Sequence, residues 1–279
     1  MEKFWLARVF YDEEISGNLT GVIKLESDIG IETSQGIATR LQLPDTAFIW
    51  NNKTMQHRTF SPYEELKFCT QTLLASAAVQ YGQSIGFARF EYETAAGIVS
   101  VFTEGDGFWW IDSNPDLVIP YLDIHVLTQL GISKELLAGR VCIGGVGRRR
   151  LYIPLATEDD LYSIRLIPSK VMHICTELGI NGISFFVKLR SDYVLLRVFT
   201  TSLAGNEDAA TGGAALGLIG YDQYCSFGLS SNVRVDQGHI ESSSRGCIYL
   251  QQDSKSGRTF LGAKVEVLAE GSILPKQMY

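Results

Sequence analysis

The sequence predicts an α+β fold made of two similar domains. Two observations carry this prediction: short β-rich segments outnumber helical ones along the chain, and the two halves of the chain resemble each other. Many strands with a few separated helices favour an α+β fold over strict βαβ alternation. The length of 279 residues accommodates two domains that each bury a core.

The expected strands combine β-branched and aromatic residues between turn signals. They are FWLARVF (4–10), TAFIW (46–50), FEYETAAGIVSVF (90–102), FWWI (108–111), LYIPL (151–155), ISFFVKL (183–189) and YVLLRVF (193–199). The helical candidates follow the apolar periodicity of an amphipathic or buried helix. They are residues 29–41, 69–81, 124–130, 168–178 and 211–224.

An internal repeat links the two halves of the chain. HRTFSPYEELKFCTQTLLASA (57–77) resembles LRVFTTSLAGNEDAATGGAALGL (196–218). Each segment has an Arg-x-Phe strand end, a loop with acids, and a small polar start to an Ala- and Leu-rich helix. Such self-similarity indicates a duplicated unit. We therefore expect one domain at residues 1–117, with a contribution from 264–279, and a second at 118–263.

Composition excludes several classes of protein. The net charge of −7, with acids and bases interspersed, argues against a nucleic-acid surface. The basic run Arg148–Arg150 is interpreted as a solvated loop, with an anion-contacting loop as the alternative. The N-terminus lacks a signal-peptide pattern, and the uncharged run 68–88 is too polar for a membrane span.

Cysteine and histidine usage suggests a location and excludes a metal centre. The five cysteines are scattered and form no CxxC pair, which favours reduced thiols in a cytoplasmic protein. The four histidines show no metal-ligand spacing, so we expect no metal.

The helix starts are candidate anion sites. A helix N-terminus presents backbone N–H groups without intrahelical partners, together with the positive end of the helix dipole. Thr211-Gly212-Gly213 places two glycines there, which costs about 1 kcal/mol each relative to alanine. Close approach of an anionic ligand would offset this cost. The alternative is a capping turn with Thr211 as the cap.

Three side chains are candidates for proton transfer. Asp208 lies beside Glu207, and two adjacent acids can acquire raised pKa values, although this pair also suits an ordinary acidic loop. Asp45 precedes an apolar strand and could equally be a turn residue after Pro44. Cys69 at a helix start could be a base or nucleophile, or a buried inert thiol.

These features together resemble the PhzF-like (phenazine biosynthesis) proteins, which share the diaminopimelate epimerase-like fold. VFYDEEISGNLTGVI resembles the family's Phe…Gly-Asn-Pro…Val opening, and LPDTAFIW its Glu-Thr-x-Phe strand. RTFSPYEELKFCTQTLLASA resembles its Cys-Gly-His-Ala-Thr helix start, and RVFTTSLAGNEDAATGGAALG its Glu-Asp-Pro-Ala-Thr-Gly-Ser-Ala signature. DQGHIESSSRG resembles the final Gln-Gly…Arg segment.

The resemblance implies two barrel-like mixed sheets, each around a central helix, with the active-site cleft between them. It also implies a homodimer and cofactor-free isomerisation, in which an acid shuttles a proton. Asp45 falls on the family's shuttle glutamate, and Asp208 on the acid of the second signature. The positions implied for binding a small carboxylate-bearing substrate are Asn18, Cys69, Thr70, Gln71, Thr211, Gly212 and Gly213.

The chain departs from the family pattern at informative positions. Asp45 is one methylene shorter than the family's glutamate, so its carboxylate reaches roughly 1.5 Å less far. Thr70-Gln71 replaces Gly-His, and Gln71 cannot take up a proton at neutral pH. Cys69 matches the first cysteine of the epimerase relatives, whereas Thr211 occupies the place of the second. This disfavours a two-thiol epimerase.

We therefore expect an isomerase that moves a proton and a double bond in a small unsaturated carboxylic or amino acid. The altered helix start suggests an unusual substrate, in a natural-product or antibiotic biosynthetic pathway. One alternative is an epimerase or tautomerase that uses Cys69 with Asp45 or Asp208. Another is a non-catalytic small-molecule-binding member of the family.

Overall fold

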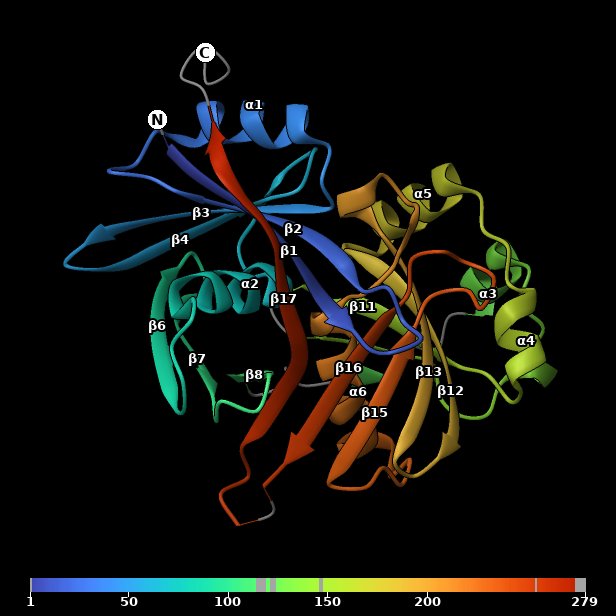
Figure 1. Ribbon diagram of the computed structural model, residues 1–279. Helices are drawn as coiled ribbons and strands as arrows, with labels where there is room; N and C mark the ends of the chain where they lie inside the picture. Colours follow the sequence, from blue (N-terminus) through green and yellow to red (C-terminus); the bar gives the residue numbers. More distant parts are fainter. Residues whose placement is uncertain (1, 114–118, 121–123, 146–147, 254, 274–279) are drawn as a thin grey trace. The chain divides into compact units, whose positions relative to one another are not determined.

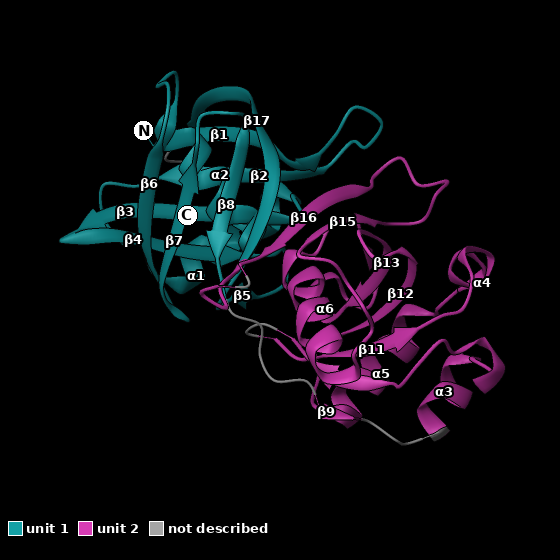
Figure 2. Ribbon diagram, turned by 90° about the horizontal axis from the view of Figure 1, so that it is seen from below, with its two compact units in different colours: residues 1–113, 260–279 teal, residues 114–259 magenta. Residues whose placement is uncertain are grey.

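The computed structural model describes residues 2–113, 119–120, 124–145, 148–253 and 255–273. The chain divides into two compact units, one formed by residues 1–113 and 260–279 and the other by residues 114–259 (Figures 1 and 2). The sequence prediction placed these boundaries at 117/118 and 263/264. In the structure, the C-terminal segment from residue 260 onward belongs to the same unit as the N-terminal segment.

The first unit contains eight long strands, one short strand and two helices in its described residues. They are β1 (Glu2–Tyr11), β2 (Asn18–Lys24), α1 (Ile31–Leu41), β3 (Asp45–Asn52), β4 (Thr54–Phe60), β5 (Glu65–Leu66), α2 (Thr70–Tyr81), β6 (Ala88–Thr94), β7 (Gly97–Thr103), β8 (Phe108–Asp112) and β17 (Thr259–Ile273).

Strand pairing closes the first unit into a barrel. The order of hydrogen-bonded neighbours is β1–β2–β3–β4–β6–β7–β8–β17, and β17 pairs again with β1. The β2–β3 and β4–β6 pairs are parallel, so the sheet is mixed. Closure removes the exposed strand edges that an open sheet would leave.

The central helix of this barrel is α2. Residues 70–78 are all buried, and the helix contacts β1, β2, β3, β6, β7 and β8. Figure 2 shows α2 surrounded by these strands. A helix that is enclosed on every side cannot have a polar face, which explains its run of Ala, Leu and small polar residues. The barrel therefore fixes the position of the helix N-terminus.

The second unit combines a mixed sheet with four α-helices in its described residues. Its elements are β9 (Ile119–Pro120), α3 (Ile124–Leu130), η1 (Lys134–Leu136), β10 (Cys142–Gly144), β11 (Arg150–Pro154), α4 (Glu158–Ser163), α5 (Pro168–Leu178), β12 (Gly182–Arg190), β13 (Tyr193–Thr200), η2 (Thr201–Leu203), β14 (Glu207–Asp208), α6 (Gly212–Cys225), β15 (Asn232–Gln237) and β16 (Gly246–Gln252). The pairing order is β9–β10–β11–β12–β13–β15–β16, with β14 also beside β13.

The side chains of β12 separate the two faces of this sheet. Ile183, Phe185 and Val187 join a core cluster with residues of α3, α4 and α5. Phe186 points to the other face, where its ring meets that of Tyr221 on α6, with 5.0 Å between centroids. Successive side chains of a strand alternate between faces, so one strand serves both layers. The helix α6 is thereby packed along its buried residues 214–221.

The structure confirms the internal duplication. In the first unit β3 and β4 are antiparallel, β4 pairs with the short β5, α2 follows, and β6 returns parallel to β4. In the second unit β12, β13, β14, α6 and β15 repeat the same pairings in the same order. The expected α+β fold of two similar barrel-like units is therefore correct.

Three local expectations were wrong. Residues 90–102 form a hairpin, β6 and β7, because the chain turns at Thr94–Gly97. The short helix α4 was missed, although Thr157 and Asp160 form a capping box at its start. In the basic run, Arg150 is buried rather than solvated: its side chain lies at the start of β11 and donates to the Arg148 carbonyl oxygen (2.8 Å).

Candidate functional site

In the first unit, the candidate acid and the candidate thiol are in contact. Asp45 is the first residue of β3, and Cys69 is the N-cap residue of α2. The Cys69 Sγ donates to Asp45 Oδ2 at 3.4 Å, and both residues are half-buried. The barrel therefore brings a carboxylate to the N-terminal end of its central helix.

The environment of Cys69 keeps its thiol protonated. Removal from water, followed by the negative charge of Asp45, raises the pKa of Cys69 well above its usual value. A thiolate would face the Asp45 carboxylate, whereas the thiol donates a hydrogen bond to it. In this pair Cys69 is the proton donor and Asp45 is the acceptor.

Gln71 and Asn18 bind each other inside the barrel. Gln71 Nε2 donates to the Leu19 carbonyl oxygen (3.0 Å) and to Thr20 Oγ1 (2.6 Å), and Asn18 Nδ2 donates to Gln71 Oε1 (3.0 Å). Gln71 has 2% of its surface exposed. These bonds use both amide hydrogens of Gln71. Its side chain therefore connects α2 to β2, and it has no amide hydrogen left to donate to a carboxylate.

The first turn of α2 contributes backbone groups instead. No side-chain hydrogen bond caps α2 within the described residues. Thr70 lies buried at the first position of the helix, and the hydroxyl of Thr72 donates to the Cys69 carbonyl oxygen at 3.1 Å. The N–H groups of such a turn have no acceptor within the helix, so they can bind an anion.

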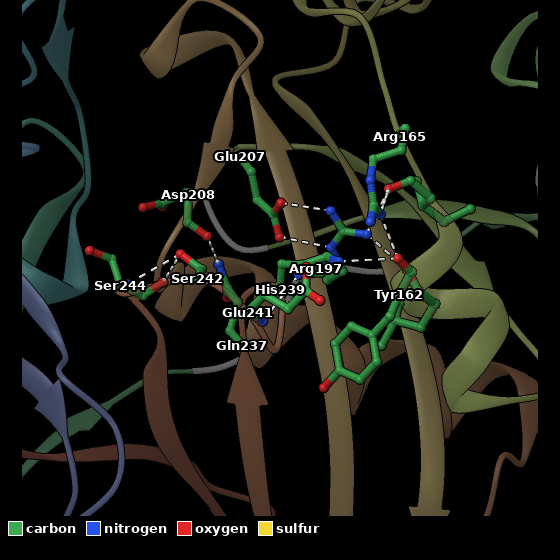
Figure 3. Close-up of polar contacts among 12 residues, drawn as sticks. Tyr162, Arg165, Arg197, Glu207, Asp208, Gln237, His239, Glu241, Ser242 and Ser244 are labelled. Carbon is green, nitrogen blue, oxygen red and sulfur yellow. Dashed lines mark hydrogen bonds and ion pairs between the residues drawn. The ribbon is translucent and has the colours of Figure 1, made fainter.

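In the second unit, Asp208, Thr211 and Gln237 form a compact hydrogen-bonded cluster. The Thr211 hydroxyl donates to Asp208 Oδ2 (2.6 Å), and the Thr211 backbone N–H donates to Gln237 Oε1 (2.9 Å). Gln237 Nε2 donates to the Asp208 carbonyl oxygen (2.8 Å) and to Thr211 Oγ1 (2.9 Å). Figure 3 shows Gln237 beneath Asp208. The acid is thus held at the entrance to α6.

Glu207 and Asp208 have separate roles although they are adjacent. Arg197 on β13 forms a bidentate pair with Glu207, with Nε–Oε1 at 2.8 Å and Nη2–Oε2 at 2.7 Å (Figure 3). The Nη1 of Arg197 donates to the carbonyl oxygens of Leu161 and Ile164 (2.9 Å each). Arg197 is buried, and four of its five side-chain N–H groups donate in these bonds. The Glu207 carboxylate therefore pairs with a buried arginine, whereas the Asp208 carboxylate accepts the hydroxyl of Thr211.

The two glycines lie where the sequence predicted. Thr211 is the N-cap residue of α6, and Gly212 and Gly213 are its first two helical residues. The alternative interpretation of Thr211 as a side-chain cap is wrong, because its hydroxyl bonds to Asp208 and makes no cap hydrogen bond. A Cβ on Gly246 would overlap Ala210, so the close approach of β16 to the residues before this helix requires glycine at position 246.

In each unit, site residues that the sequence predicted lie in contact with one another. The first brings Asp45 to Cys69 and Asn18 to Gln71, and the second brings Asp208 to Thr211. The sequence prediction missed Gln237 as a site residue. Its signal was present, because it belongs to the Gln-Gly segment that follows the second helix.

The chain is similar in sequence to known proteins over most of its length. A family model for phenazine biosynthesis-like proteins (PhzC-PhzF) matches residues 7–267. An uncharacterized isomerase of Pasteurella multocida (strain Pm70) is 26% identical over 278 residues, covering 97% of this chain and 93% of that relative. An uncharacterized isomerase of Clostridium acetobutylicum is 26% identical over 222 residues, covering 74% of each chain.

A solved structure from Pseudomonas aeruginosa, described as a predicted epimerase, has the same fold. Its TM-score is 0.82 at 18% identity, covering 98% of this chain and 99% of that one. The family and the names of the curated relatives support the expectation that the chain is an isomerase. None of the described helices is long and apolar enough to cross a membrane.

Proposed function

Because the chain belongs to the phenazine biosynthesis-like family, we propose that it is a cofactor-independent isomerase of small unsaturated carboxylic or amino acids. The reaction moves a proton between two atoms of the substrate, and a C=C or C=N bond shifts with it. The non-standard helix start at Thr70-Gln71 favours a substrate from a natural-product pathway.

The contact between Asp45 and Cys69 is the observation that carries this proposal. The Cys69 thiol donates to one oxygen of Asp45 at 3.4 Å, which is the arrangement expected for an ionised carboxylate. Asp45 takes a proton from a carbon of the substrate and becomes a carboxylic acid, while the electron pair enters the conjugated system. A proton that has exchanged with solvent then returns from Asp45 to another atom of the substrate, so no cofactor or redox partner is required.

The first turn of α2 would bind the substrate carboxylate. Its backbone N–H groups and the helix dipole favour an anion. Because the Gln71 side chain is committed to Leu19, Thr20 and Asn18, we assign this binding to the backbone rather than to the Gln71 amide. Thr70 and Gln71 thus contribute through their N–H groups.

The second unit contains a hydrogen-bond acceptor of its own, Asp208. Asp208 is oriented by Thr211 and by Gln237, which leaves it suited to accept a hydrogen bond from an amine or hydroxyl. The glycines at 212 and 213 would allow close approach to the α6 backbone.

The Cys69-based epimerase has less support. A proton-trading thiol needs a reachable thiolate, and both the removal of Cys69 from water and the Asp45 charge oppose its ionisation. In the second unit the matching position is Thr211, whose hydroxyl is a much weaker acid than a thiol. Asp45 is accordingly the preferred base.

Deuterium uptake from D₂O into a panel of unsaturated amino and carboxylic acids tests this function. Asp45→Asn keeps the shape of the side chain and removes its basicity, and Cys69→Ala removes the thiol. Asp192→Asn is the matched control, because Asp192 is exposed and paired with Arg190. Binding of each acid is measured separately by calorimetry.

We expect uptake in wild type and in Asp192→Asn, partial activity in Cys69→Ala, and loss of at least about 100-fold in Asp45→Asn. Uptake that survives in Asp45→Asn but disappears in Cys69→Ala would establish the epimerase alternative. An acid that binds without exchanging any hydrogen would favour a binding protein.

A further inference from the structure

A second pair of reactive groups lies at the opposite end of α6 from the candidate site. Cys142 and Cys225 are free cysteines whose sulfur atoms are 3.7 Å apart. Cys142 is on β10 and is fully buried, whereas Cys225 is the last residue of α6 and is half-buried. We propose that this pair is a dithiol site that reacts with low-molecular-weight disulfides to form an intramolecular disulfide.

The distance between the sulfurs suits bond formation. A disulfide needs the sulfurs at about 2.05 Å, so they must approach by roughly 1.7 Å. Cys142 is held by strand pairing with Tyr152 and Pro120. Cys225 lies at a helix end, followed by Ser226 in the left-handed conformation (φ 52°). Helix termini move more readily than paired strands, so Cys225 can make most of the adjustment.

A pocket gives the reagent access to Cys225. The cavity has a volume of about 630 Å³, and its lining includes Cys225, Tyr221, Tyr224, Arg140 and Lys188. Lys188 donates to the Phe227 carbonyl oxygen, which holds its ammonium at this wall. Two cations at the pocket favour an anionic disulfide such as oxidised glutathione.

The two cysteines have different parts in the reaction. Burial raises the pKa of Cys142 to about 12, and Cys225 is the one of the two that lines the pocket. Cys225 as thiolate therefore attacks one sulfur of the disulfide RSSR, which releases RS⁻ and forms a mixed disulfide. Cys142 then loses its proton and attacks the Cys225 sulfur, which releases the second RS⁻. Two cysteine thiols are oxidised, and one RSSR is reduced to two RSH.

The sequence alone did not indicate that these two cysteines are paired. The two cysteines are 83 positions apart and form no CxxC motif. They meet because the duplicated fold places the C-terminal end of α6 against β10. A disulfide between them would connect the C-terminal end of α6 to β10. Thr211 is the N-cap residue at the other end of this helix.

The experiment treats the folded wild-type protein with oxidised glutathione, blocks remaining thiols with N-ethylmaleimide in denaturant, and maps the digested peptides by mass spectrometry. We expect loss of the blocked peptides for Cys142 and Cys225, and a cross-linked peptide lighter than the two thiols by two hydrogen atoms. Dithiothreitol should reverse both changes. The buried Cys175, 1% exposed, is the internal control and should remain fully blockable.

Two variants separate the steps. Cys142→Ser should accumulate a stable glutathione adduct on Cys225, and Cys225→Ser should leave Cys142 unmodified. A wild-type protein that keeps both thiols free would overturn the proposal. So would a stable glutathione adduct on wild-type Cys225, because Cys142 would then have failed to resolve it.

Discussion

The hydroxyl of Thr211 donates to the carboxylate of Asp208 at 2.6 Å, although Thr211 occupies the N-cap position of α6. An N-cap threonine ordinarily accepts a hydrogen bond from the helix backbone. Here the hydroxyl donates to Asp208 instead. Among the described residues, no side chain accepts a cap hydrogen bond from the first turn of α6. The helix therefore lacks the stabilisation of a side-chain cap, and under the proposed function its N-terminal backbone groups would bind the ligand.

Replacing Thr211 with Val should lower proton-exchange activity. Valine keeps the shape of the side chain but removes the donor to Asp208, and hydrogen bonds to charged groups contribute about 1.5–3 kcal/mol. We expect kcat/KM for deuterium exchange to fall about tenfold or more. Thr211→Ser restores a hydroxyl and should recover most of the activity. Equal rates in Thr211→Val and wild type would show that this bond has no catalytic consequence.

Replacing Gln237 with Ala should destabilise the second unit. Gln237 is fully buried and makes three hydrogen bonds to Asp208 and Thr211. Truncation leaves these groups without their partner and opens a cavity, so we expect a loss of about 2–4 kcal/mol in the free energy of unfolding. Urea denaturation measures it. Gln251→Ala, at an exposed position of β16, should change stability by less than about 0.5 kcal/mol.

Replacing Asp45 with Asn should make Cys69 more reactive. The charge of Asp45 and its hydrogen bond with the thiol both raise the pKa of Cys69, so their removal favours the thiolate. We expect iodoacetamide at pH 8 to alkylate Cys69 several-fold faster in Asp45→Asn than in wild type, up to about tenfold. The alkylation rate of Cys175, in the other unit, should not change. Identical Cys69 rates would contradict the assigned contact.

The buried His57 should make the protein sensitive to acid. His57 on β4 is 4% exposed, and burial lowers its pKa from 6.5 to about 4. The unfolded chain therefore binds a proton between pH 6.5 and 4 that the folded protein does not, and stability falls as pH decreases through this range. The contribution of His57 amounts to about 3 kcal/mol between pH 7 and pH 4.

Urea denaturation at pH 7, 5.5 and 4 measures this effect. His57→Gln has no group that titrates in this window, so its stability should fall less steeply with pH than that of wild type. Parallel pH profiles for the two proteins would contradict the prediction.

Local patterns in the sequence were sufficient for most elements and for the duplication. The five expected helices were found, with boundaries shifted by at most two residues. Apolar periodicity determines such segments directly, since each helix buries a continuous surface. The hairpin at residues 88–103 was read as one strand because the turn at Thr94–Gly97 contains two alanines and a single glycine, a weak turn signal.

The sequence by itself determined which residues are chemically capable: the carboxylates at 45 and 208, the thiol at 69 and the two helix starts. Tertiary structure alone decided their roles. Glu207 and Asp208 are equivalent acids in sequence, but Arg197 pairs with Glu207, and Thr211 donates to Asp208. The sequence implied that Gln71 binds substrate, and in the folded barrel its side-chain amide bonds to Leu19, Thr20 and Asn18. Because these hydrogen-bond partners come from strands distant in the chain, a local sequence pattern cannot predict them.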